Sequence, residues 1–180
     1  MLGGPGFGKR RADRRAGLAD DTQLGVAHHD LAALGPEVDA EQAPADWLAA
    51  VNAATRAALP VGTTIDGIGV TGQLDGAVAL DRGGAPCGPA LIWMDRRASV
   101  PSLPADFFGR TGQVADAGHL GPKAAWLAAR TPMARVHVPV SYLVERLTGV
   151  AVLDPSHAST TMACRLGASS WDPELLACFG

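Results

Sequence analysis

The chain has 180 residues, 47% of them hydrophobic, and its mean hydropathy is +0.11. This length and composition allow one domain with its own core and exclude disorder throughout. A net charge of -3 and a pI near 5.9 exclude the broad basic surface that nucleic-acid-binding proteins present.

The cysteines are few and far apart in the sequence. Cys87, Cys164 and Cys178 are odd in number and form no Cys-x-x-Cys pair, so neither a disulfide framework nor a zinc site is indicated. No apolar run approaches the roughly 18 residues that a membrane span needs. We therefore expect a cytoplasmic protein without a membrane or nucleic-acid partner.

Residues 1–35 differ from the rest, since Gly, Arg and Asp dominate without sustained periodicity, and we expect a poorly ordered leader. Within it, Gly3–Lys9 fits a phosphate-loop pattern, but Arg10 stands where Ser or Thr should bind Mg²⁺. The adjacent histidines at 28–30 are weak evidence for a metal. We expect neither a nucleotide loop nor a metal site, and we interpret Gly62–Thr64 as a connector.

A helix and three strands are predicted first. The range 44–59 opens with proline, repeats apolar residues at three- and four-residue steps, and is followed by proline, which predicts an amphipathic helix. Short apolar runs at 65–70 and 77–80 predict strands, and a Gly-rich turn precedes a third strand that ends at Trp93. Three strands in order predict a meander.

Helices dominate the second half of the chain. Proline at a first helical position, apolar residues at helical spacing and a Gly or Asp at the ends are the signals. They predict helices at 104–110, 122–130 and 138–147, with Gly149 as a cap, a helical turn at 154–156, and a last helix capped by Asp172. A short strand is expected at 151–153. Strands followed by helices predict an α/β domain.

The most informative stretch is 66–97, where polar and aromatic side chains lie near the ends of predicted strands. This layout suits a site for a small polyol. The candidate substrate-binding residues are Gln73, Leu74, Asp75, Trp93, Asp95 and Arg96.

Each candidate has a structural alternative. Asp75 either accepts a ligand hydroxyl or is a solvated turn residue, and we favour the first. Trp93 either stacks on the apolar face of a sugar or fills the core. Asp95 and Arg96 either contact the ligand or form an N-cap and a neighbouring ion pair behind the site, which we favour slightly. Gln73 either binds the ligand or its own turn.

The Gly-Gln-x-x-Gly turn at Gly72–Gly76 and the Trp-x-Asp-x-Arg segment that begins at Trp93 resemble the amino-terminal domain of the FGGY carbohydrate kinases, of the xylulose kinase type. Further matching segments follow in the family's order over 36–180. They are Gly121–Lys123, Tyr142–Leu143, Arg146–Gly149, Asp154 and Trp171–Asp172.

The resemblance implies an α/β, actin-like ATPase or ribonuclease-H-like fold of two domains that close on sugar and ATP. It also implies that the chain is incomplete, because the first strands and the whole second domain are missing. The catalytic aspartate and the nucleotide pocket belong to that missing domain. ATP and Mg²⁺ are thus implied for the complete enzyme, and neither is expected to bind well to this chain.

The resemblance places substrate contacts at Leu74 and Asp75. Xylulose kinases usually have Met-His there and glycerol kinases Arg-Glu. Leu-Asp matches neither pair, so the identity of the sugar is left open. The expected activity of the complete enzyme is transfer of the ATP γ-phosphate to a hydroxyl of a pentulose such as xylulose, or of a similar polyol. The alternative is a non-catalytic fragment that binds a sugar or a partner chain. A second kinase domain, or self-association through an exposed sheet edge, would supply that partner.

Overall fold

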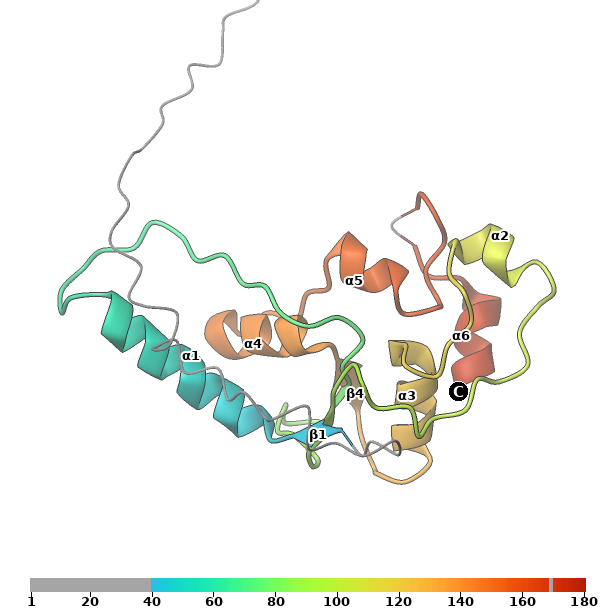
Figure 1. The fold of residues 1–180 in the computed structure, drawn as a ribbon, viewed down its shortest axis with the longest axis horizontal. Helices are drawn as coiled ribbons and strands as arrows, with labels where there is room; N and C mark the ends of the chain where they lie inside the picture. Colours follow the sequence, from blue (N-terminus) through green and yellow to red (C-terminus); the bar gives the residue numbers. More distant parts are fainter. Residues whose placement is uncertain (1–39, 169) are drawn as a thin grey trace, which may run out of the picture.

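The computed structural model describes residues 40–168 and 170–180, and the predictions for residues 1–35 lie outside them. The described part is a mixed α/β structure. In Figure 1, α1 lies at one end, α2 and α6 lie at the other, and the short strands lie between them.

The strands form two antiparallel pairs. Strand β1 (Glu41–Gln42) pairs with β3 (Ala90–Leu91), and β2 (Val78–Leu80) pairs with β4 (Arg135–His137). In the second pair Ala79 faces Val136. An isolated bridge between Ala77 and Leu91 joins the two pairs. The predicted strand at 77–80 and the strand before Trp93 are therefore confirmed, but the meander is wrong.

Two predicted strands do not form. Residues 65–70 and 151–153 have no strand conformation. Ile65 and Ile68 are exposed, at 45% and 68%. A strand requires a hydrogen-bonded neighbour, and the described residues pair none with either segment. Apolar content alone misled the prediction, because it does not show which segments meet.

Most helices follow their end signals. The structure has α1 (Pro44–Ala58), α2 (Phe107–Thr111), α3 (Leu120–Ala128), α4 (Pro139–Thr148), α5 (Pro155–Ser159) and α6 (Pro173–Phe179). The carboxylates of Asp154 and Asp172 accept backbone N–H groups at the starts of α5 and α6, and for Asp172 this cap was predicted. Gly149 ends α4 in the left-handed conformation.

Two helices differ from their predicted ranges. Helix α2 begins three residues after 104, and α3 begins two residues before 122. In both cases a proline was taken as the first helical residue. Pro104 instead contributes its carbonyl to a turn with Phe107, while Pro122 is the third residue of α3.

The core lies on both faces of β2. Ala77 and Ala79 pack on one side with Leu120 and Leu127 of α3. Val78 and Leu80 pack on the other side with Tyr142 of α4, against which Trp47 of α1 also packs. Successive residues of a strand point to opposite faces, so this short buried strand is covered by helices on both sides. A further cluster joins α2 and α6 through Phe107, Leu175 and Phe179.

Candidate functional site

The predicted turn before β2 holds Asp75 in an uncommon backbone conformation. Its φ is 58°, in the left-handed region that Asp adopts more readily than most residues. A Cβ on the next residue, Gly76, would lie 2.6 Å and 2.8 Å from two ring carbons of Pro139. Glycine is therefore required here so that the turn can lie against the start of α4.

The segment after β3 lies beside this turn. The backbone N–H of Trp93 donates a hydrogen bond to Oε1 of Gln73, at 3.1 Å. Through this oxygen Gln73 links the two predicted site segments rather than binding its own turn. The Trp93 side chain is 54% exposed, so it does not fill the core.

A cavity of about 360 Å³ opens where these segments meet. It brings together three of the predicted residues, Asp75, Trp93 and Arg96. Leu74, which is 46% exposed, does not line it, and neither do Gln73 and Asp95. The complete lining is Asp75, Trp93, Arg96, Val114, Asp116, Gly118 and His119.

The predicted role of Asp95 as an N-cap is wrong, because no helix begins there. Its carboxylate is fully buried and accepts hydrogen bonds from the backbone N–H and Nε of Arg97, at 3.1 Å and 2.9 Å. Arg97 also forms an ion pair with Glu41 of β1, at 2.6 Å. Ion pairs do form at both residues, since Asp95 pairs with Arg97 at 2.8 Å and Arg96 pairs with Asp116 at 2.8 Å. Asp95 supports the site from behind.

The loop before α3 supplies two residues that the sequence did not predict. Asp116 accepts a hydrogen bond from Nη2 of Arg96 at 2.8 Å and one from the N–H of Gly118 at 2.7 Å. The Arg96 contact, followed by that of Gly118, lowers the pKa of Asp116. Asp116 therefore stays ionised and fixes the position of Arg96 at the edge of the cavity.

His119 is the second unpredicted residue. Its Nδ1 lies 3.2 Å from Oδ1 of Asp75, without the alignment of a good hydrogen bond, so we describe the pair as a charge contact. The neighbouring Asp75 carboxylate raises the pKa of His119, while burial opposes the rise. A signal was present in the sequence, since Asp116, Gly118 and His119 form a polar turn just before an apolar helix.

The arrangement suits a molecule with several hydroxyl groups. Asp75 and Asp116 present carboxylate acceptors, Arg96 and His119 present donors, and Trp93 offers an aromatic face. Sugars need such a mixture, because each hydroxyl both donates and accepts while the carbon–hydrogen faces are apolar.

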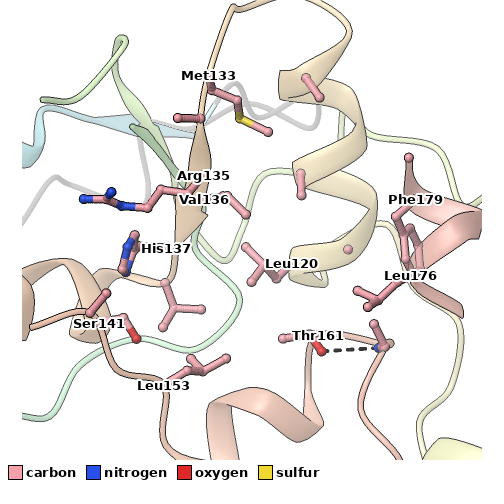
Figure 2. A pocket seen from close by; sticks show the side chains of 18 of the residues that line it. Leu120, Met133, Arg135, Val136, His137, Ser141, Leu153, Thr161, Leu176 and Phe179 are labelled. Atoms are coloured by element: carbon pink, nitrogen blue, oxygen red, sulfur yellow. Dashed lines mark hydrogen bonds between the residues drawn. The ribbon is translucent and has the colours of Figure 1, made fainter. Parts of the chain in front are cut away.

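A larger cavity of about 620 Å³ lies between α3, β4 and α6. Figure 2 shows Arg135, His137 and Ser141 at one end and Leu176 and Phe179 at the other. Leu120, Val136 and Leu153 also line it, so its wall is mostly apolar. It shares no lining residue with the polar cavity.

Within residues 40–168 and 170–180, His, Cys, Asp and Glu side chains form no group of three or more that is placed to hold a metal ion. No helix in the same ranges has the length and apolar character needed to cross a membrane.

Known proteins resemble this chain over most of its length. Residues 22–180 match the model of the FGGY family of carbohydrate kinases, N-terminal domain. A glycerol kinase from Trichlorobacter lovleyi is 35% identical, in a match that covers 87% of this chain and 36% of that protein. A xylulose kinase from Streptomyces rubiginosus is also 35% identical, over 78% of this chain and 32% of that protein. The chain thus spans about a third of the length of these curated relatives.

Solved structures agree. The crystal structure of a xyloylose kinase from Brucella ovis superposes with a TM-score of 0.69 at 35% identity, over 78% of this chain and 32% of that one. The α/β, actin-like fold predicted from the resemblance is confirmed for the amino-terminal part. By its sequence match and its fold together, the chain belongs to the FGGY family of carbohydrate kinases and represents the N-terminal domain of that family.

Proposed function

We propose that this chain carries the sugar-side domain of a kinase that phosphorylates a pentulose such as xylulose, or a similar polyol. The polar cavity carries the proposal. In it Asp75 accepts a substrate hydroxyl, Trp93 stacks on the apolar face of the sugar, and Arg96 donates to a second hydroxyl. Leu74 packs at the rim of the site, while Gln73 and Asp95 hold its backbone from behind.

The sugar's identity is set by groups around this cavity. Relatives include both glycerol kinases and xylulose kinases, whose names give a triol and a ketopentose as substrates. Leu74 and Asp75 match the usual residues of neither kind. The contact between Asp75 and His119 places a charged acceptor and a donor side by side, which favours a substrate with two neighbouring hydroxyls.

Kinases of this family use ATP. Gly62–Thr64, which resembles a phosphate turn in sequence, forms an exposed connection rather than a phosphate cradle. The amide and hydroxyl of Thr63 both donate to the carbonyl of Pro60, at 3.1 Å and 2.8 Å. We therefore propose that a second kinase domain supplies the nucleotide site and the catalytic aspartate to the complete enzyme.

The location proposed for this enzyme is the cytoplasm. Cys87, Cys164 and Cys178 are all free thiols in the described structure. Reduced, scattered cysteines are typical of proteins in a reducing compartment.

Isothermal titration of the purified chain with D-xylulose and with glycerol tests the function, after a cooperative melt is shown. We expect one of the two to bind. Asp75→Asn should weaken that binding about tenfold, equivalent to about 1.4 kcal/mol, because the charged acceptor is lost. Asp66→Asn is the matched control, since Asp66 is exposed and lies outside the cavity. A folded chain that binds neither compound, or equal binding by Asp75→Asn, would contradict the proposal.

As a second candidate we propose a non-catalytic fragment that binds a sugar or a partner chain. A phosphorylation assay with ATP separates the two. Turnover by the 180-residue chain alone would reject the hypothesis of a non-catalytic fragment. It would also show that no second domain is needed for catalysis. Binding of sugar without turnover, followed by turnover when a second domain is added, would support the kinase.

A further inference from the structure

Lys123 is a fully buried lysine near the middle of α3, with no exposed surface. It is the only lysine in the described part of the chain. An ammonium group in the interior is costly unless its three N–H donors are satisfied. All three have partners, since Nζ lies 2.7 Å from the carbonyl oxygen of Asp75, 2.8 Å from that of Ile92 and 3.4 Å from that of Trp93.

These carbonyl groups belong to the two segments that form the polar cavity. Asp75 lies in the turn before β2, and Ile92 and Trp93 follow β3. The backbone bonds between these segments stop at the pair of Ala77 and Leu91, whose N–H and carbonyl groups exchange bonds of 2.7 Å and 3.0 Å. Beyond that pair, side chains link the two segments.

Two side chains provide this link in the described structure. Gln73 accepts the N–H of Trp93, and Lys123 donates to the carbonyl groups on both sides. The lysine comes from a third element, α3, so it fixes both segments against the helix. A shift of either segment would leave a charged donor buried without a partner, which costs more than an ordinary lost hydrogen bond.

We propose that Lys123 is a positioning residue for the sugar site, which holds Asp75 and Trp93 at the spacing that the ligand requires. The proposal rests on the proposed function for the identity of the ligand but not for the positioning itself. Lys123 touches the backbone behind the site and does not line the cavity, so it acts through Asp75 and Trp93.

Replacement by a side chain of similar length without the charge tests this role. Lys123→Met should shift the backbone amide resonances of Gly76, Trp93 and Met94 and weaken binding of D-xylulose or glycerol about tenfold. Leu175→Ala is the matched control. It removes a fully buried side chain from the cluster between α2 and α6, so it lowers stability while leaving these resonances and the affinity of the folded chain unchanged.

The outcomes separate the two proposals. Shifted resonances without binding of either sugar by the wild-type chain would reject the proposed ligand and keep the positioning role. Unchanged resonances in a folded Lys123→Met chain would overturn the positioning role. So would a loss of affinity no greater than that of Leu175→Ala.

A titration of the wild-type chain covers the case in which Lys123→Met does not fold. Burial lowers the pKa of Lys123 to about 8, while the charges of Asp75, Asp95 and Asp116 raise it and that of Arg96 lowers it. His119 also faces Asp75, which raises its pKa, and its imidazole resonances report its own titration separately. Between about pH 7 and about pH 10, the carbonyl ¹³C resonances of Asp75 and Ile92 should therefore move together as Lys123 loses its proton. Resonances of Asp75 and Ile92 that titrate with different midpoints would overturn the proposal.

Discussion

Two regions of the molecule each place a histidine beside a carboxylate, but the pKa of the histidine shifts in opposite directions. In the polar cavity, Nδ1 of His119 lies 3.2 Å from a carboxylate oxygen of Asp75, and its pKa is raised. At the apolar cavity, Nε2 of His137 lies 3.0 Å from a carboxylate oxygen of Glu145, yet its pKa is lowered. A neighbouring carboxylate therefore does not by itself determine the direction in which a histidine's pKa shifts.

The difference comes from burial and from a competing cation. His137 is only 8% exposed, so the charged imidazolium loses most of its hydration. Arg135 contacts the other oxygen of Glu145, and its positive charge disfavours protonation of His137. At His119 the Asp75 contact outweighs burial. The comparison shows that a histidine beside a carboxylate has a raised pKa only where the attraction exceeds the cost of burial and the repulsion of nearby cations.

The two cavities also differ in what they can recognise. The larger one has a mostly apolar wall and gives few fixed partners to a hydroxyl group, whereas the smaller one collects acids, bases and an aromatic ring. The smaller cavity therefore suits a sugar better than the larger one, because specificity depends on converging polar groups.

The largest expected effect is a loss of stability from a change near the apolar cavity that leaves binding in the polar cavity unchanged. Gly121 of α3 approaches α6 closely, and a Cβ there would lie 2.7 Å from the carbonyl oxygen of Thr161 and 2.9 Å from the Phe179 ring. Gly121→Ala should therefore lower the free energy of unfolding by about 2 kcal/mol. Chemical denaturation measures this loss, and the folded chain should keep its sugar affinity.

Gly109→Ala is the control for this substitution. Gly109 lies inside α2, and an added Cβ would meet nothing within 4 Å. The change should stabilise the chain by about 0.5 kcal/mol, because alanine favours a helix over glycine. If the two substitutions have equal effects on stability, the close contacts of Gly121 are not the reason that a larger residue is unfavourable there.

The next effect tests the buried histidine. The folded-state pKa of His137 is lowered by burial, so the neutral form contributes stability that is present above about pH 6.5 and is lost as the pH falls through the lowered pKa. His137→Gln should reduce the acid-induced loss of stability between about pH 7 and about pH 5, because the buried imidazole that resists protonation is removed. Denaturation of both chains across this range measures it, and parallel curves would contradict the assignment.

His119 should behave in the opposite direction. Its folded-state pKa is raised, so its contribution is fully present below about pH 6.5 and is lost as the pH rises through the raised pKa. An NMR titration of the imidazole resonances measures the shift. Asp75→Asn should return the His119 pKa toward its ordinary value and remove a stability difference of less than about 1 kcal/mol. An unchanged His119 pKa in that variant would show that Asp75 is not the cause.

The sequence predicted those parts of the fold that have local signals. Proline and glycine mark the ends of α4, and Asp154 and Asp172 cap helices, because these contacts lie within a few residues. Strand pairing depends on segments far apart in the chain. Strands β1 and β4 are Glu-Gln and Arg-Val-His, which lack the apolar run that marked β2 and β3, so neither was predicted.

The same distinction applies to the site. Asp75, Trp93 and Arg96 were predicted from their places near strand ends, and the structure brings them to one cavity. His119 and Lys123 were missed because their partners are separated from them by many residues. Lys123 still carried a signal, since a single lysine in an otherwise apolar helix needs a buried partner. Which carbonyl groups Lys123 binds could be learned only from the three-dimensional fold.

The smallest expected effect on stability concerns Arg96, and it sharpens the distinction between holding the fold and recognising a ligand. Its ion pair with Asp116 is exposed, at 63% and 38% for the two side chains, so solvent screens it. Arg96→Met should change the free energy of unfolding by less than about 0.5 kcal/mol. Sugar affinity should nevertheless fall several-fold, because a donor that lines the cavity is lost. Titration and denaturation of the same sample measure both quantities, and a variant that loses stability but keeps affinity would assign Arg96 to the fold rather than to the site.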